Sequence, residues 1–276
     1  MKNKKTLLFE SGRYVIVAGI GIALLFPLYF MIMNSFKSEG GFHLNKWAPS
    51  FQDINLENYT IAFEAVKGYL VNSFYLAVLI TGLILLVSGI TAYVFSAYEF
   101  PGKKILFFGI IIVLMIPGIL TFIPTYQIVQ LLGMNDNHIA VIIPGVAGGQ
   151  IFTIYVLRGF FEQIPKDITE AARIDGANDV QLIVNVIFPL AMPMLTTMGV
   201  LAIIGQWNNY MWPLVTLPSR ELWTIPIGIR FLSEAGNIRT TVQYAAYTLV
   251  SIPLIVLFGF TMDKFVEGLS SGAIKG

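Results

Sequence analysis

The chain has 276 residues, of which 56% are hydrophobic and only 12% charged, and its mean hydropathy is +0.74. Soluble proteins carry about 25% charged residues, so this composition predicts an integral membrane protein. A net charge of +1 without a basic run gives no sign of a nucleic-acid partner, and the lack of cysteine excludes disulfides, thiol catalysis and cysteine metal sites.

Six stretches without Asp, Glu, Lys, Arg or His are long enough to span a bilayer, which takes about 20 residues. They are residues 14–36, 68–98, 105–135, 139–157, 189–219 and 240–262. A basic N-terminus precedes the first stretch, but no small-residue cleavage pattern follows it, which favours a retained span over a signal peptide. Several stretches exceed the required length, so their ends are expected to include interfacial or re-entrant segments. Prolines within them predict kinks: Pro117, Pro124, Pro144, Pro193 and Pro253.

The distribution of lysine and arginine predicts the orientation. With a cytoplasmic N-terminus, the inner segments carry eleven of these residues and the outer segments six. The inner set is Lys2, Lys4, Lys5, Arg13, Lys103, Lys104, Arg158, Lys166, Arg173, Lys264 and Lys275. The sequence therefore predicts an all-α fold of six transmembrane helices, with both termini and the loop 158–188 in the cytoplasm. The loops 37–67 and 217–239 lie outside.

The residue pattern of the loop 158–188, here called the coupling loop, predicts two short helices joined at a glycine. Pro165 suits a first helical turn, and the face of that helix holds Ile168, Ala171, Ala172 and Asp175. Gly176 can adopt the left-handed conformation that ends a helix. Asn178 with Gln181 three residues on is typical of a capping box that starts the next helix. Alanines on an exposed face would let a partner backbone approach closely.

The spacing within this loop resembles a known signature. Glu170-Ala171-Ala172, three residues, Gly176, nine residues, then Val186-Ile187-Phe188-Pro189 is similar to the cytoplasmic loop of permease subunits in ATP-binding-cassette importers. The family usually has isoleucine and leucine where Val186 and Phe188 stand. The resemblance implies a type I importer fold, in which this loop docks on ATPase subunits, with Glu170 as a charged anchor and Gly176 as a hinge or a point of close approach. The assigned set is Glu170, Ala171, Ala172, Asp175, Gly176 and Pro189.

Three further segments resemble the sugar permeases of that class. The inner turn 93–104 and the outer loop 37–67 are similar to theirs, although a lysine-rich Pro-Gly turn and a solvated connector explain these segments physically. Gln206, Asn208 and Asn209 end the fifth span, where amides need polar partners and could line a translocation path. By resemblance, the loop 217–239 would reach into a docked solute-binding protein.

The tail 263–276 would by composition be a disordered end. It resembles the tail of the smaller maltose permease subunit, which inserts between the two ATPase subunits. This similarity assigns the ATPase interface to Ser271, Gly272 and Lys275.

The chain has no phosphate-binding loop of the Gly, four residues, Gly-Lys-Ser/Thr pattern, and its spans lack the ionisable groups of ion-coupled carriers. His43 and His138 lie outside the spans and are too isolated to suggest a metal site. The chain is therefore expected to be a transport subunit that binds no cofactor and has no catalytic residues.

The resemblance implies one single-domain subunit of a bacterial inner-membrane sugar importer of the maltose/glycerol-phosphate type. Its partners would be a second permease, two ATPase subunits that bind ATP and Mg, and an extracytoplasmic solute-binding protein. One alternative is a permease for amino acids, peptides or phosphate, and another is a membrane scaffold or enzyme. The sequence does not name the sugar.

Overall fold

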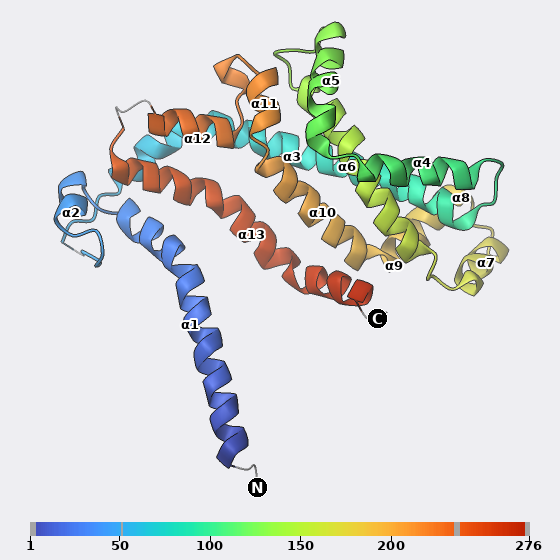
Figure 1. The fold of residues 1–276 in the computed structure, drawn as a ribbon, viewed down its shortest axis with the longest axis horizontal. Helices are drawn as coiled ribbons and strands as arrows, with labels where there is room; N and C mark the ends of the chain where they lie inside the picture. The colour runs from blue at the N-terminus through green and yellow to red at the C-terminus, as the bar shows by residue number, and fades with distance from the viewer. Residues whose placement is uncertain (1–3, 51, 235–237, 274–276) are drawn as a thin grey trace. The chain divides into compact units, whose positions relative to one another are not determined.

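A computed structural model describes residues 4–50, 52–234 and 238–273, with side chains over 12–50, 52–234 and 238–266. The described elements are helices, and one isolated bridge pairs Lys37 with Ile54 (Figure 1). The chain divides into two compact units. The first joins Met1–Lys67 with Ile229–Ile252, and the second joins Gly68–Gly228 with Pro253–Gly276.

The first unit contains α1 (Lys4–Ser35), α2 (Glu39–Leu44), the start of α3 (Glu57–Ala97), the end of α12 (Ile225–Glu234) and the start of α13 (Thr240–Ala273). The segment between α1 and α3 is folded on itself. The Lys37 ammonium is buried and donates to the carbonyls of Asn45 and Ala48 at 2.6 and 2.8 Å. The predicted outer loop 37–67 is thus ordered here, and α3 begins at Glu57, within that predicted loop.

The second unit holds the rest of α3, α12 and α13 and the elements between them. These are α4 (Lys103–Met115), α5 (Gly118–Leu131), α6 (Ile139–Phe161), α7 (Lys166–Ile174), α8 (Asp179–Leu182), the π-helix η1 (Ile183–Ile187), α9 (Phe188–Leu190), α10 (Met192–Trp207), α11 (Met211–Thr216) and the 3-10 turn η2 (Arg220–Leu222).

Four described helices are long and apolar enough to cross a membrane: Gly12–Ser35, Glu57–Ala97, Ile139–Phe161 and Thr240–Val266. Two further candidates are bent pairs, Lys103–Met115 with Gly118–Leu131 at 102° and Asp179–Leu190 with Met192–Trp207 at 81°. Counting each bent pair as one span gives the six that were predicted. The first bend falls at Pro117 and the second just before Pro193, where the sequence predicted kinks. Pro124, Pro144 and Pro253 lie inside helices.

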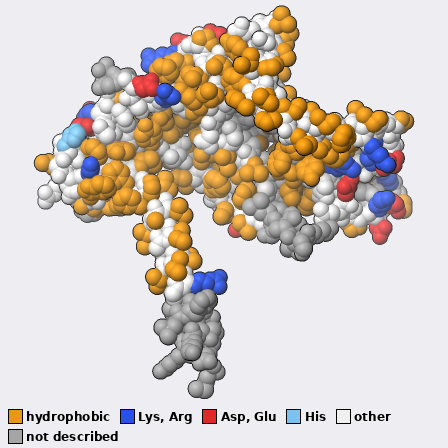
Figure 2. All heavy atoms as spheres, in the orientation of Figure 1, with side chains coloured by type: hydrophobic (Ala, Val, Ile, Leu, Met, Phe, Trp, Pro, Cys, Tyr) orange, Lys and Arg blue, Asp and Glu red, His pale blue; other side chains and the backbone are white. Residues whose placement is uncertain are grey.

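Helices α3 and α6 pack closely because small residues of α6 face large residues of α3. A Cβ at Gly149 would overlap Ile84, and one at Gly145 would lie 3.3 Å from Ile80. Ile80 and Ile84 belong to a buried cluster with Val141 of α6. On the visible face of the second unit, hydrophobic side chains cover the helices, and charged ones gather at the end that carries α7 and α8 (Figure 2).

Candidate functional site

The coupling loop folds as its capping residues predict. Helix α7 follows Pro165, which has φ −57° and precedes the first helical residue. Gly176 has φ +88°, so the predicted left-handed stop is confirmed. Asn178 accepts from the Gln181 backbone N–H at 2.9 Å, while the Gln181 side chain accepts from the Asn178 N–H at 3.0 Å. This reciprocal capping box starts α8.

The residues of the signature divide into an exposed and an inward-facing set. Glu170, Ala171, Asp175 and Gly176 are exposed, and none of the residues of α7 is buried. Ala172 is half-buried and packs against an apolar cluster instead of presenting its methyl group to solvent. The exposed face is therefore narrower than the sequence predicted. Pro189 is also exposed, at the start of α9, well beyond the α7–α8 turn.

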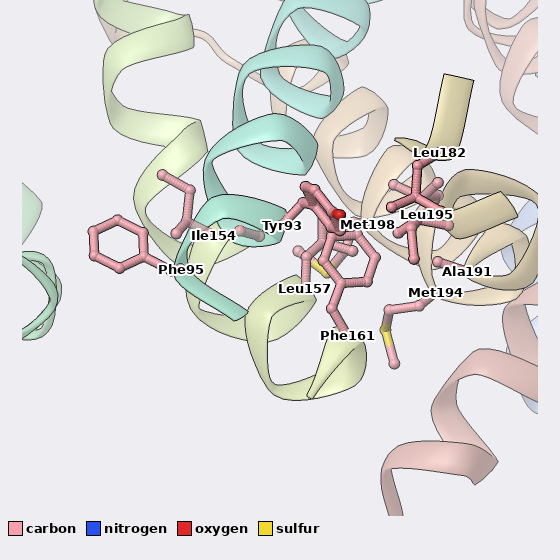
Figure 3. Close-up of a cluster of buried hydrophobic side chains, with 12 residues drawn as sticks. Tyr93, Phe95, Ile154, Leu157, Phe161, Leu182, Ala191, Met194, Leu195 and Met198 are labelled. Atoms are coloured by element: carbon pink, nitrogen blue, oxygen red, sulfur yellow. The ribbon is translucent and has the colours of Figure 1, made fainter. Parts of the chain in front are cut away.

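An apolar cluster anchors the far side of the loop to the spans (Figure 3). Leu182 of α8, Ile187 of η1 and Ala191 are nearly inaccessible to solvent and pack with residues of α3, α6 and α10. The α3, α6 and α10 members are Ala92, Tyr93, Phe95, Ile154, Leu157, Phe161, Met194, Leu195 and Met198. Because protein interiors are closely packed, a displacement of α8 must move these spans or break the cluster.

A polar network holds α7 and α8 to the end of α3. The Tyr98 hydroxyl donates to the Asp179 carboxylate at 2.6 Å, and the Arg173 guanidinium donates to both partners at 2.9 Å. The bond to Asp179 is the main reason that the pKa of Tyr98 is raised, so this hydroxyl remains a donor at neutral pH. The hydrogen bond to Tyr98, followed by one to Tyr93, raises the pKa of Arg173. These contacts were not predicted, because Tyr98 and Asp179 are far apart in sequence and neither forms a local motif.

The neighbouring turn carries its own ion pair. The Lys103 ammonium lies 2.8 Å from the Glu99 carboxylate and donates to the Tyr98 carbonyl at 2.8 Å. The hydrogen bond that Lys103 donates to the Glu99 carboxylate is the main cause of the lowered pKa of Glu99. Gly102 has φ +82°, as the predicted Pro-Gly turn requires. The turn thereby fixes the position of Tyr98.

A cavity of about 580 Å³ opens between α7 and the end of α3. Its lining combines aromatic and charged side chains: Tyr93, Tyr98, Glu99, Glu162, Lys166, Thr169, Glu170 and Arg173 among others. Glu170 thus lies at the edge of a polar recess. No group of three His, Asp or Glu side chains within the described residues is arranged to hold a metal ion.

The three amides lie where α10 ends. Asn208 is exposed and donates to the Ile204 carbonyl at 2.9 Å, while Gln206 and Asn209 are half-buried. Trp207 beside them is 5% exposed, and the Trp212 indole donates to the Ala140 carbonyl at 2.8 Å. Both tryptophans pack within the described chain, and the role of the amides in translocation stays a prediction.

The tail follows α13, which continues through Ala273. Ser271 and Gly272 therefore have a helical backbone, and nothing is described of their side chains. Lys275 lies outside the described residues. Through Ala273 the backbone is therefore helical, whereas composition alone predicted a disordered end.

Comparison with known proteins places the chain in a family. Residues 84–271 match the family described as "Binding-protein-dependent transport system inner membrane component". The chain is 29% identical to the arabinooligosaccharides transport system permease protein AraQ of Halalkalibacterium halodurans, and the match covers 100% of both. It is 30% identical to the melibiose/raffinose/stachyose import permease protein MelC of Bacillus subtilis, with 95% of each covered.

A solved structure has the same fold. A bacterial ABC transporter involved in the import of the acidic polysaccharide alginate has a chain that superposes with a TM-score of 0.86, covering 96% of this chain and 99% of that one at 23% identity. The fold is therefore that of an ABC-importer permease, and the predicted all-helical membrane architecture is confirmed. The chain belongs to the inner-membrane components of binding-protein-dependent transport systems. It is a multi-pass transport subunit and not itself the catalytic one.

Proposed function

We propose that this permease carries a sugar or an oligosaccharide, as one subunit of an importer driven by separate ATPases. AraQ and MelC are named for the transport of arabinooligosaccharides and of melibiose, raffinose and stachyose, and both match over nearly their full length. The complete importer would add a second permease, two ATPase subunits that bind ATP and Mg, and an extracytoplasmic solute-binding protein. Each of these partners would contact a different part of this chain.

The observation that carries the coupling role is the exposed helix α7 beside a buried anchor. Glu170 and Ala171 are exposed and available to an ATPase, while Leu182 and Ile187 hold the same loop in the apolar cluster. Closure of the ATPases would push α7 as a rigid lever, and the cluster would transfer that motion to the spans. The spans would switch between inward-open and outward-open arrangements, a two-state change that nucleotide and the loaded binding protein both bias.

We assign the translocation path to the amides at the end of α10. Gln206, Asn208 and Asn209 supply both donors and acceptors, which sugar hydroxyls require, in a chain whose predicted spans carry no charged side chain. Asn208 presents its amide at an exposed position. Alanine at Asn208 and Asn209 together should lower sugar uptake and leave ATPase attachment unchanged.

Reconstitution with its partners tests the whole proposal. The chain is co-purified with the second permease, the ATPases and the cognate binding protein, and uptake of labelled oligosaccharides into proteoliposomes is measured with and without ATP. ATP-dependent uptake that requires the binding protein supports the proposal. Uptake of an amino acid, peptide or phosphate instead would assign a non-sugar permease, and purification without an ATPase would favour a scaffold.

The coupling residue is tested in the same preparation. Glu170→Gln should reduce uptake and ATPase attachment, because it removes the charge that an ATPase would contact. It breaks no hydrogen bond within the described chain, so the fold of α7 should be unchanged. Asp167→Asn is the matched control, since it removes an exposed carboxylate from the first turn of the same helix. Equal losses in both variants would mean that general charge on α7, and not Glu170, matters.

A further inference from the structure

The polar network of Tyr98, Arg173 and Asp179 closes a triangle between three elements. Tyr98 follows the last residue of α3, Arg173 lies in the last turn of α7, and Asp179 begins α8. Each pair is within 2.6–2.9 Å, and the Arg173 guanidinium also lies 5.9 Å from the centre of the Tyr98 ring. The Tyr98 hydroxyl donates to Asp179, and one guanidinium nitrogen of Arg173 donates to both Tyr98 and Asp179, so the three bonds form a closed ring.

The triangle contributes less to the stability of the fold than to the relative position of the three elements that it joins. The Arg173 and Asp179 side chains are 49% and 61% exposed, and ion pairs that are so accessible to water contribute little to stability. The loop also has an apolar anchor separate from these side chains, because Leu182 of α8 and Ile187 of η1 are buried in the cluster. The triangle is therefore better suited to fixing a geometry than to holding the protein folded.

Helix α7 is the element that needs such a fixing contact. It has no buried residue, and its last residue, Ile174, is 86% exposed. It joins α8 through Gly176, which has a positive φ and open space where a side chain would stand. A helix attached so lightly could swing about Gly176 under load, and the motion would be lost before it reached the spans.

We propose that Tyr98, Arg173 and Asp179 form a clasp that makes α7 and the inner end of α3 move as one body. The proposal rests on the proposed function, because it assigns these residues to the transfer of work from the ATPases. They are positioning residues, since none of them is assigned to contact sugar or nucleotide. Through the clasp, a displacement of α7 reaches α3 directly, in parallel with the route through the apolar cluster.

The central experiment separates transport from hydrolysis. Tyr98→Phe removes one hydroxyl and keeps the ring that packs edge-on against Tyr93. In the complete reconstituted importer, we expect sugar transported per ATP hydrolysed to fall roughly threefold or more, with assembly of the complex unchanged. Tyr155→Phe is the matched control, because the Tyr155 ring stacks on Phe107 and its hydroxyl has no hydrogen bond within the described chain. The control should keep the wild-type ratio.

A covalent rescue distinguishes a clasp from a general packing contact. The chain contains no cysteine, so Tyr98→Cys combined with Arg173→Cys introduces the chain's only two thiols, one at the end of α3 and one on α7. With cysteine-free partner subunits, this variant should be uncoupled as purified and should recover transport per ATP once a short, reducible bifunctional thiol reagent joins the two positions. Reduction should abolish the recovery.

The outcomes separate the clasp from the function on which it rests. If the Tyr98→Phe variant transports as much sugar per ATP as an active wild type, the clasp proposal alone is overturned. The same holds if the cross-linked variant transports no more sugar per ATP than it did before cross-linking. A wild-type complex that shows no ATP-driven sugar uptake would overturn the proposed function itself.

Discussion

Gly176 is the residue whose conformation the sequence and the structure define most directly. Its φ of +88° lies in the left-handed region, where a side chain is strained even though nothing lies within 4 Å of the position of a Cβ. The need for glycine here is conformational, and it does not come from lack of space. This distinction leads to a test that uses the shape of the substituent.

Gly176→Val should destabilise the α7–α8 turn by about 1–2 kcal/mol, since a β-branched residue is poorly tolerated at positive φ. ATPase attachment and sugar uptake should both fall, because α7 would no longer leave the turn in the same direction. Gly176→Asn is the control: asparagine adopts this conformation more readily and should retain most activity. The measurements are co-purified ATPase and uptake in proteoliposomes. Full uptake and attachment in the valine variant would contradict the hinge assignment.

Residues of the site could be predicted where their interactions are local. The Asn178–Gln181 capping box spans three residues, and a glycine stop lies at the end of its own helix, so the sequence alone indicated both. Tyr98 could not be predicted to meet Asp179, because their hydrogen bond depends on the direction in which α3 and α8 leave the apolar cluster. Ala172 was assigned to the exposed face by its helical period, yet that face also borders the cluster.

At the scale of elements, the packing of α3 against Phe188 links a span to the coupling loop. A Cβ at Gly89 would lie 2.7 Å from Cζ of Phe188, whereas one at Gly82 on the same helix would meet nothing within 4 Å. Both glycines lie in the long apolar helix α3. They therefore form a matched pair in which the same substitution has opposite consequences.

Gly89→Ala should destabilise the detergent-purified chain by about 1–3 kcal/mol, because the added methyl group forces Phe188 out of its position. Gly82→Ala should be neutral or stabilising by up to about 1 kcal/mol, since alanine restricts the unfolded chain and favours the helix. Thermal unfolding of both variants beside the wild type provides the comparison. Equal midpoints for the two variants would show that Phe188 moves aside without cost.

Another element-scale contact caps α13 from outside the helix. The Glu39 carboxylate of α2 accepts from the backbone N–H groups of Thr240 and Thr241, each at 3.2 Å. Burial alone would raise the pKa of Glu39, but the hydrogen bonds from Thr241 and Thr240 outweigh it and hold the pKa below its ordinary value of 4.5. A carboxylate here also suits the positive end of the α13 dipole.

Glu39→Gln should therefore cost about 0.5–2 kcal/mol at neutral pH, the usual range for a helix cap. Because the folded-state pKa of Glu39 is lowered, the wild type has this stabilisation above pH 4.5 and loses it as the pH falls through the folded-state pKa. The difference between wild type and variant should then shrink in acid. Unfolding midpoints at several pH values measure it, with Glu64→Gln as a control that disrupts only an exposed ion pair with Lys67. A difference that stays constant with pH would contradict the capping role.

The bent spans mark the limit of prediction from hydropathy. Residues 105–135 form one uninterrupted apolar stretch in the sequence, whereas the structure bends by 102° between α4 and α5. Hydropathy records how apolar a segment is and carries no information on its direction. Only the prolines at positions 117 and 124 predicted a kink here, and the bend falls at the first of them. The predicted span 189–219 is likewise divided, into α9, α10 and α11.

At the scale of the whole molecule, α1 shows that this chain is built for an assembly in a membrane. None of the most apolar 18-residue window of Gly12–Ser35 is buried within the chain, and its aliphatic side chains are among the most exposed. Lipid or another subunit of the transport system must cover such a surface, because large apolar areas are unfavourable in water. The second permease expected from the family resemblance would be one such cover.

The last prediction concerns the end of α13. Helix backbone continues through Ala273, so the segment from residue 263 would project from the membrane as a helical extension of the last span. Its resemblance to the maltose-type tail predicts that Ser271, Gly272 and Lys275 would contact ATPase subunits. A single exposed helical end gains little stability on its own, and ordering against a partner would supply the missing contacts.

Removal of residues 271–276 should leave membrane insertion intact, because the candidate spans end at Val266 or earlier. ATPase association or binding-protein-stimulated hydrolysis should nonetheless weaken, since the ATPases would lose a contact that the coupling loop does not replace. The truncated and full-length chains are each reconstituted with their partners, and stimulated ATPase activity and complex stability are compared. A chain with Ser270→Ala alone controls for changes at the cut site. Equal activity and equal stability in the truncated complex would make residues 271–276 an ordinary helix end with no part in ATPase docking.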